Sequence, residues 1–274
     1  MREVWNSAMG IGDSTCALYA ACGLADALGE VTYHVRHFDW LTDFSHPNLT
    51  LVRHQDNMHM GSDMNWDYDK QLQTASSRKQ WYTDNVLRSW NIQAHVTPVA
   101  PKFITKPAPV ITDKKNYVLI SPFADYSSRT YQNVHWARVV DLLYDRGIEV
   151  VVIGLDQERL RSAFGKTPAP YFWGQSTAWV RSAIANAACV IGNDSGIPHI
   201  AGLYNVPTVA VMAHLAPSMV FSHTNVVAIT PPAPCSPCSW QGSRGWRQSC
   251  DELGCSALQS ISPETIVGRV IKLL

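Results

Sequence analysis

The sequence predicts an α/β protein with two halves, each built around a parallel sheet. Short apolar segments alternate with amphipathic ones along most of the chain, as expected for successive β–α–β units. Segment 149–153 is apolar after its first residue, which is typical of a strand buried on both faces of a parallel sheet. Four prolines in the stretch 98–109 predict a stiff linker. We therefore predict two Rossmann-like domains, at 1–105 and 106–274.

The N-terminal half begins with a short strand, a glycine-containing loop and an alanine-rich helix. Segment 54–70 contains many His, Met, Asn and Asp residues with little periodicity, and predicts a long loop on the working face. The predicted elements of this half are strands at 3–6, 31–35 and 49–53 and helices at 14–28 and 78–90.

The C-terminal half repeats the alternation more regularly. Arg146-Gly147 ends one predicted helix, and Ser262 is the predicted N-cap of the last one. The predicted elements are strands at 117–120, 149–153, 190–192 and 208–212 and helices at 134–145, 178–187, from 197 onward, and 263–274.

Composition narrows the classes of function. The 274 residues are 46% apolar and 16% charged, with a formal net charge of +0. No basic face is implied, so nucleic acid is not the expected partner. No apolar run approaches the ~20 residues that cross a bilayer, and the N-terminus lacks the features of a signal peptide. We therefore predict a cytoplasmic protein without a membrane span.

The most informative segment is 190–212, which predicts strand, loop, helix and strand. The residues Asn193-Asp-Ser-Gly196 follow the first strand and open the helix. Open α/β sheets bind ligands at this place, where free N–H groups and the positive end of the helix dipole lie. We predict that Asp194, Ser195 and His199 contact a ligand. The alternatives are helix capping by the first two and a core position for the histidine.

A second candidate site is the loop Gly10-Ile-Gly12-Asp13 after the first strand. The two glycines suggest a dinucleotide fingerprint, but its third glycine is missing. They also let the backbone approach a ligand closely. Asp13 places a carboxylate at the start of the predicted helix, as a candidate general base or as a helix cap.

These segments resemble glycosyltransferase family 9, the ADP-heptose-type heptosyltransferases. In that family an Asp-Ser/Thr-Gly-x-x-His-x-Ala segment, here Asp194 to Ala201, precedes a Pro-Thr strand and binds the sugar nucleotide. Gly12-Asp13 matches the Gly-Asp at the end of the family's first loop. The resemblance implies a GT-B fold, with domains facing across a cleft. It implies that domain 1–105 binds the acceptor and domain 106–274 the nucleotide sugar.

The resemblance also implies a mechanism, which is inverting transfer with Asp13 as catalytic base and without a catalytic metal. Arg129 stands at the family's cationic position, where it would neutralise a leaving diphosphate. Two local sequences depart from the family: Ser121-Pro-Phe123 replaces His-Pro-Gly, and Thr130-Tyr131 replaces Trp-Pro. The residues that we predict to bind the donor are Gly12, Ser127, Ser128, Arg129, Gly154, Gln175, Asp194, Ser195, Gly196 and His199.

Within that set, Gly154 ends a strand where a nucleotide-binding Rossmann half forms its base and ribose pocket. Gln175 lies in a Gly-Gln-Ser segment that resembles a small polar segment of the family. His214 replaces the family's usual Gly-Pro turn after the strand at 208–212. We expect His214 either to contact substrate or to be an exposed loop histidine.

Seven cysteines fall into two groups. Cys16, Cys22 and Cys189 lie in apolar segments and are predicted core thiols. The pattern Cys235-x2-Cys238-x11-Cys250-x4-Cys255 matches a four-thiolate site for structural zinc or iron. Free thiols and two disulfides are the alternatives.

We therefore predict an inverting glycosyltransferase that moves a heptose-like sugar or a hexose from a nucleotide-diphosphate donor to a hydroxyl. Its acceptor is a lipopolysaccharide sugar, a protein or a modified DNA base. Two alternatives remain open at this point. One is a nucleotide-sugar epimerase on the same fold, and the other is a non-catalytic protein that binds nucleotide sugars or macromolecules and carries a metal finger.

Overall fold

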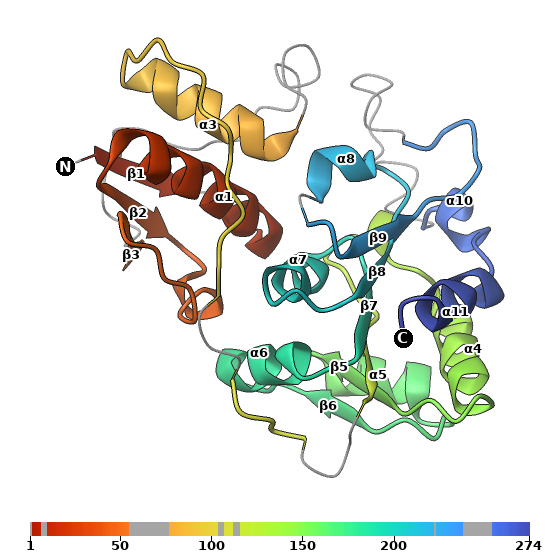
Figure 1. The fold of residues 1–274 in the computed structure, drawn as a ribbon. Coiled ribbons are helices and arrows are strands. Elements are labelled where there is room, and N and C mark those ends of the chain that lie inside the picture. Colours follow the sequence, from red (N-terminus) through yellow and green to blue (C-terminus); the bar gives the residue numbers. More distant parts are fainter. Residues whose placement is uncertain are drawn as a thin grey trace. The chain divides into compact units, whose positions relative to one another are not determined.

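The computed structural model divides into two compact units. The N-terminal unit comprises Met1–Lys106 and Ser218–His223, and the C-terminal unit comprises Pro107–Pro217 and Thr224–Leu274. Each unit contains a parallel sheet, so the predicted α/β class is confirmed (Figure 1). The structure describes residues 2–6, 10–54, 77–103, 107–111, 116–221, 223–237 and 254–274.

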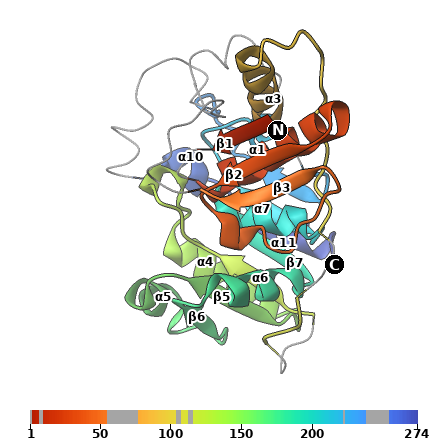
Figure 2. The same ribbon diagram turned by 90° about the vertical axis from the view of Figure 1, so that its left-hand side faces the viewer.

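The N-terminal unit has a three-stranded parallel sheet in the order β1-β2-β3 (Figure 2). Helix α1 packs on this sheet, and α3 packs on α1. Nearly all of the predicted loop 54–70 lies outside the described residues. The elements are β1 (Arg2–Asn6), α1 (Ile11–Leu28), β2 (Val31–Val35), the 3-10 helix η1 (Phe38–Trp40), β3 (Leu49–Arg53) and α3 (Arg78–Ser89).

Helix α1 begins at Ile11, three residues before the predicted start at Ser14. The N–H of Ser14 already donates to the carbonyl of Gly10 at 3.2 Å. A glycine costs little in the first turn because the N–H groups there have no partner within the helix. Asp13 is therefore a residue of the first turn, where a carboxylate interacts favourably with the helix dipole.

A short segment from late in the chain completes the N-terminal unit. The backbone carbonyl of Val220 accepts a hydrogen bond from the Cys16 thiol, with sulfur and oxygen 3.4 Å apart. The hydroxyl of Tyr19 lies 2.7 Å from Nδ1 of His223, and both residues are buried. Polar contacts therefore connect the segment to helix α1.

The C-terminal unit has a six-stranded parallel sheet in the order β6-β5-β4-β7-β8-β9. The chain starts at the centre with β4, moves outward to β6, returns to the centre at β7, and moves outward again to β9. The neighbours β4 and β7 therefore form the topological switch point of a Rossmann-type sheet. The strands are β4 (Val118–Ser121), β5 (Val150–Gly154), β6 (Tyr171–Trp173), β7 (Cys189–Asn193), β8 (Thr208–Val211) and β9 (Val226–Ile229).

Helices cover both faces of this sheet (Figure 1). Helices α4 and α5 contact β5, and α11 contacts β8 and α4. On the opposite face α7 contacts β7 and β8, and α6 packs on α7. These helices are α4 (Asn133–Tyr144), α5 (Gln157–Phe164), α6 (Thr177–Ala185), α7 (Gly196–Leu203) and α11 (Pro263–Ile271). The shorter elements of this unit are η2 (Ser127–Arg129) and α10 (Ser256–Gln259). Helix α8 (Pro217–Val220) lies almost wholly in the segment that belongs to the N-terminal unit.

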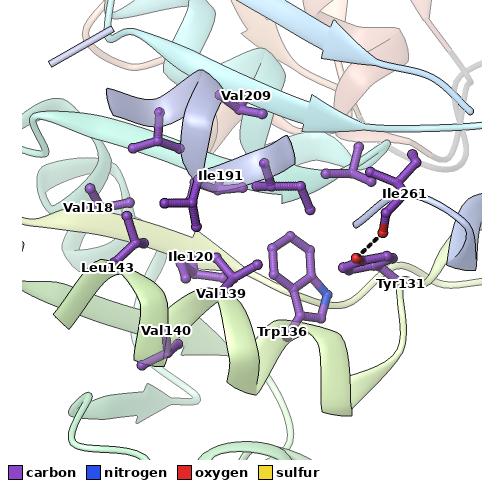
Figure 3. Packing of buried hydrophobic residues seen from close by; sticks show 14 of the residues in the cluster. Val118, Ile120, Tyr131, Trp136, Val139, Val140, Leu143, Ile191, Val209 and Ile261 are labelled. Carbon is purple, nitrogen blue, oxygen red and sulfur yellow. Dashed lines mark hydrogen bonds between the residues drawn. The ribbon is translucent and has the colours of Figure 1, made fainter. Parts of the chain in front are cut away.

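The core of the C-terminal unit lies between the sheet and helices α4 and α11 (Figure 3). Trp136 is fully buried there, and its indole N–H donates to the carbonyl of Pro122 at 3.0 Å. Tyr131 packs edge-on against Trp136 and donates its hydroxyl hydrogen to the carbonyl of Ile261. These bonds satisfy the polar ends of two large aromatic side chains. They also anchor the loop between β4 and α4.

Several short elements are absent from the sequence prediction. Helix α5 buries only Leu160 and Phe164, and its other residues are mostly charged or small. Strand β6 has three residues and follows a proline, and β9 is a half-buried edge strand of four residues. Such elements carry too few periodic positions to stand out from loops. Likewise, α8 and α10 have only four residues each.

The three cysteines predicted to be core thiols are buried, as expected. Burial raises the pKa of Cys189 to about 12 and also raises the pKa of Cys22. Among the helices that the structure describes, none combines the length and the apolar character needed to cross a membrane.

Candidate functional site

The candidate site of the C-terminal unit lies at the carboxyl ends of β4 and β7. These strands are paired, with Ser121 opposite Gly192, and the chain then leaves them toward helices on opposite faces. A Cβ atom on Gly192 would lie 3.2 Å from the Ser121 carbonyl oxygen and from Cγ of Pro198. Glycine therefore allows β4 and the start of α7 to approach closely. In open α/β sheets this crevice is the usual ligand site.

Asn193 ties the two loops of the switch point together. Its Oδ1 accepts a hydrogen bond from the backbone N–H of Tyr131 at 3.2 Å, and its Nδ2 donates to the carbonyl of Pro122. The side chain is fully buried, so both bonds are shielded from water. The loop that follows β7 is thereby fixed against the loop that follows β4.

Arg129 is brought to this crevice from the other loop. Its guanidinium lies 4.8 Å from the centre of the Tyr126 ring, and Nη1 donates to the backbone carbonyl of Asp194 at 3.4 Å. The same loop forms η2, in which Ser128 is buried. The structure therefore brings the predicted residues Ser127, Ser128 and Arg129 close to the Asp194 segment.

Asp194 is buried beside His214. The Nε2 atom of His214 lies 3.4 Å from Oδ2 of Asp194, and each side chain is only 6% exposed. The interpretation of His214 as an exposed loop histidine is therefore wrong. It fails because β7 and β8 are neighbours, so residues that directly follow them lie together at the carboxyl edge.

The start of α7 is not capped by a side chain. Ser195 occupies the N-cap position, but its hydroxyl makes no capping hydrogen bond. That hydroxyl is buried, and no partner for its Oγ occurs in the part of the chain that the structure describes. Simple capping therefore does not account for Ser195. Gly196 begins the helix, and His199 is buried within it, as expected for a core histidine. Contact of either residue with ligand stays a prediction.

The ends of β5 and β6 form a neighbouring part of the same edge. The N–H of Gly174 donates to the carbonyl of Gly154 at 3.2 Å, and Nε2 of Gln175 donates to the carbonyl of Trp173 at 3.1 Å. Leu155 is 89% exposed and Trp173 is 42% exposed. These two apolar side chains were not predicted. The sequence indicated them only by their position, because Leu155 follows Gly154 and Trp173 precedes Gly174.

A hollow of about 460 Å³ lies where α4 begins, again at the carboxyl edge. Gln132, the N-cap residue of α4, makes no side-chain capping bond. Arg159 of α5 contributes a cation, which lies 4.0 Å from the centre of the Phe123 ring. Arg159 was not predicted because α5 was not predicted. The hollow is lined by Ser127, Thr130, Tyr131, Gln132, Asn133, Val134, Arg159, Gly254 and Gln259.

In the N-terminal unit, Asp13 is held by two residues of α3. Nη1 of Arg78 donates to Oδ1 of Asp13 at 2.6 Å, and the hydroxyl of Tyr82 donates to the same oxygen at 3.3 Å. The N-cap of α1 is Gly10, so the interpretation of Asp13 as the helix cap is wrong. Gly12 lies in the first turn, where its carbonyl accepts from the Thr15 hydroxyl at 2.8 Å. Neither α3 residue was predicted, although their i, i+4 spacing places them on one helix face.

The four-cysteine pattern is only partly described. Cys235 is exposed, whereas Cys255 is buried. Cys255 is the N-cap of α10, and its sulfur accepts a hydrogen bond from the N–H of Leu258 at 3.3 Å. Cys238 and Cys250 lie outside the described residues. Within the described ranges, no group of three or more His, Cys, Asp or Glu side chains could hold a metal. The fit of zinc or iron therefore rests on four thiols at suitable spacing.

Comparisons with solved structures identify the fold. Escherichia coli heptosyltransferase WaaC with ADP is 12% identical and superposes with a TM-score of 0.69, covering 100% of both chains. E. coli ADP-heptose LPS heptosyltransferase II is 12% identical, with a TM-score of 0.72 over 100% of this chain and 98% of that one. The iron-containing dodecameric glycosyltransferase TibC from enterotoxigenic E. coli is 16% identical, with a TM-score of 0.68 over 99% of this chain and 75% of that one.

At these identities the likeness shows the fold, and the predicted GT-B class is confirmed. No curated protein matches the chain. The sequence profile of glycosyltransferase family 9 (heptosyltransferase) matches residues 83–243, which is more than half of the chain. The match includes the switch point, with Arg129, Asp194 and the start of α7. The chain therefore belongs to glycosyltransferase family 9.

Proposed function

We propose that this glycosyltransferase is inverting and transfers a heptose-like sugar or a hexose from a nucleotide-diphosphate donor to a hydroxyl. The observation that carries the proposal is the switch point, where a cation, a buried carboxylate and an uncapped helix start come together. Arg129 donates to the Asp194 carbonyl, and the Ser195 hydroxyl leaves α7 without a side-chain cap. The neighbours WaaC and TibC were solved with ADP and with ADP-D-β-D-heptose, which supports a donor of this class.

The diphosphate of the donor is assigned to Arg129 and the N-terminal N–H groups of α7. A guanidinium and a helix N-terminus both stabilise the negative charge that grows on a departing diphosphate. Hydroxyls of Ser127, Ser128 and Ser195 add hydrogen-bond donors, and Gly196 lets the phosphates approach the backbone. His199 supports the phosphate or the sugar.

The remaining donor groups are assigned to the neighbouring edge. Asp194 hydrogen-bonds sugar hydroxyls or the nucleotide ribose. Gly154 and Gln175, at the ends of β5 and β6, line the base and ribose pocket. Exposed apolar side chains beside them, Leu155 and Trp173, offer surface against which a base can pack.

The N-terminal unit is proposed to bind the acceptor, with Asp13 as the catalytic base. The Asp13 carboxylate takes the proton of the acceptor hydroxyl while the hydroxyl oxygen bonds to the anomeric carbon. The bond from that carbon to the diphosphate oxygen breaks, and its electron pair leaves with the diphosphate. Arg129 supplies the positive charge at the leaving group, so the scheme needs no catalytic metal.

Transfer to an acceptor panel tests this proposal, with wild type compared with Asp13→Asn. The panel contains a lipopolysaccharide core sugar, a protein and hydroxylated DNA. Asn keeps the size of Asp but cannot accept the proton, so we expect transfer to fall by about 10²–10⁴-fold with unchanged donor affinity. Sugar conversion without any acceptor would instead indicate an epimerase. Binding without either reaction would indicate a non-catalytic protein.

A structural zinc or iron is proposed for Cys235, Cys238, Cys250 and Cys255. Four thiolates satisfy the tetrahedral preference of either metal and leave no open position for a substrate. The neighbour TibC is described as iron-containing, which supports the assignment but does not choose between the metals.

A further inference from the structure

The two oxygens of the Asp13 carboxylate have different surroundings. Oδ1 accepts two hydrogen bonds, from Arg78 and from Tyr82. No hydrogen bond to Oδ2 occurs among the residues that the structure describes. A Cβ atom built on Gly10 would lie 2.7 Å from Oδ2, well inside van der Waals contact. Oδ1 is therefore anchored by two hydrogen bonds, whereas Oδ2 can occupy its position only because residue 10 has no side chain.

Arg78 is the first residue of α3, a helix that is capped and packed at this end. Ser77 caps α3 by accepting the N–H of Gln80 at 3.3 Å, and α3 packs along α1. The Arg78 side chain is only 7% exposed, whereas that of Asp13 is 24% exposed. The cation is therefore less accessible than the carboxylate that it contacts. A surface ion pair contributes little, but this pair is partly shielded and its geometry is fixed.

Tyr82 can act only as a donor toward Asp13. Its side chain is fully buried, and burial together with the nearby Asp13 carboxylate raises the pKa of its hydroxyl well above 10. The hydroxyl therefore keeps its proton at neutral pH. Arg78 and Tyr82 are four residues apart on one face of α3, so a single helix presents both donors to the same oxygen.

We propose that Arg78 and Tyr82 are positioning residues that hold Asp13 through Oδ1 and leave Oδ2 as the atom that accepts the acceptor's proton. The inference rests on the proposed role of Asp13 as base. The proton of the acceptor hydroxyl moves to Oδ2 while the hydroxyl oxygen bonds to the anomeric carbon. The anomeric bond to the diphosphate breaks, and the electron pair leaves with the diphosphate. Gly10 is required because a side chain there would displace Oδ2.

The experiment measures kcat, acceptor KM, donor Kd and Tm for five variants. Arg78→Met should lower kcat by about 10- to 100-fold with little change in acceptor KM or donor Kd, because a misplaced base reacts slowly. Arg78→Lys keeps a cationic donor at this position and should recover part of the lost kcat. Tyr82→Phe should lower kcat by about 3- to 10-fold, the effect of one lost hydrogen bond. The matched control is Arg88→Met, since Arg88 lies on the same helix and its guanidinium donates to Asn85 and lies over the Trp81 ring.

Gly10→Ala tests the open side of the carboxylate. Gly10 has φ −94° and ψ 141°, an extended conformation that alanine adopts without strain. A fall in kcat with unchanged donor Kd and Tm would therefore report displacement of Oδ2. If Arg78→Met does not fold, Tyr82→Phe and Gly10→Ala still decide the question.

Two outcomes separate this inference from the proposed function. If Asp13→Asn is inactive but the Arg78, Tyr82 and Gly10 variants behave like Arg88→Met, the positioning roles are wrong and the base assignment stands. If Asp13→Asn retains wild-type transfer, the base assignment itself is wrong. Parallel losses of Tm and kcat in Arg78→Met, with no recovery of kcat in Arg78→Lys, would show that Arg78 is only structural.

Discussion

The imidazole of His214 lies against the carboxylate of Asp194, with Nε2 3.4 Å from Oδ2 and both side chains 6% exposed. The two residues follow neighbouring strands, so the pairing is built into the sheet. A buried carboxylate is costly without partners, and a protonated imidazole at this distance offsets part of that cost, although Oδ2 makes no hydrogen bond among the described residues. His214 therefore supports the residue that we propose to bind the donor.

Replacement of His214 should weaken donor binding. Without the imidazole, the buried Asp194 carboxylate loses its ion-pair partner, and we expect His214→Ala to raise the donor Kd by about 5- to 100-fold, the equivalent of ~1–3 kcal/mol. Calorimetric titration measures this change, with His95→Ala, an exposed histidine, as the control. A donor Kd equal to that of the control would show that His214 has no part in binding.

Ser195→Ala separates ligand binding from helix capping. Because the Ser195 hydroxyl makes no capping bond, its loss should leave the free energy of unfolding within about 0.5 kcal/mol of wild type. Ser262 is the matched control, since its hydroxyl accepts the N–H of Thr265 at 3.2 Å, and Ser262→Ala should cost about 1 kcal/mol. Denaturant unfolding measures both. Donor affinity should fall for Ser195→Ala and not for Ser262→Ala. A loss of stability in Ser195→Ala with unchanged donor affinity would show that Ser195 acts as a helix cap.

The stability of the N-terminal unit should decrease in mild acid. Burial and the nearby Lys79 lower the pKa of His223 from 6.5 to about 4, so the unfolded chain binds a proton more readily than the folded chain between these values. The free energy of unfolding should therefore decrease as pH falls from about 6.5 to about 4, by ~3 kcal/mol from this residue.

His34 also has a lowered pKa, so the measurement compares pH dependences rather than single values. His223→Gln should flatten the dependence of unfolding free energy on pH relative to wild type. Identical slopes for both proteins in this range would mean that His223 does not titrate as the structure implies.

The four-cysteine pattern predicts about one zinc or iron atom per chain in protein purified without chelator. Cys238→Ser should lower Tm more than it weakens donor binding, because the metal is structural and the donor site is elsewhere. Elemental analysis and a thermal melt measure the two quantities. A metal content near zero, with four titratable thiols, would leave the free-cysteine interpretation.

The main elements of the fold could be predicted because their signals are local. The strands 31–35 and 49–53 have the predicted bounds, and the buried strands of the C-terminal sheet differ by one or two residues. Helix α5 and strands β6 and β9 could not be predicted, because short, charged or half-exposed elements depend on contacts with the rest of the sheet. The start of α1 was misplaced because Gly12 and Asp13 are poor helix formers that the first turn tolerates.

The residues of the candidate site likewise include some that could be predicted from the sequence and some that could not. Asp13, Arg129 and Asp194 stand in motifs that the sequence displays, so they could be proposed before the structure. Arg78 could not, because 65 residues separate it from Asp13 in the chain and only the packing of α3 on α1 brings the two together. The burial of His214 likewise follows from strand order, which no local pattern encodes.

Calorimetric titration with ADP-, GDP-, UDP- and CDP-linked sugars tests the central claim, that the switch point of the C-terminal unit binds a nucleotide-sugar donor. We predict that the wild-type protein binds at least one of them. Arg129→Met should weaken that binding by about 10-fold or more, because it removes a charge-assisted bond to the diphosphate. Arg161→Met, which removes an exposed arginine paired with Glu158, should bind like wild type. Binding of none of these sugars, or equal affinity of wild type and Arg129→Met, would contradict the account.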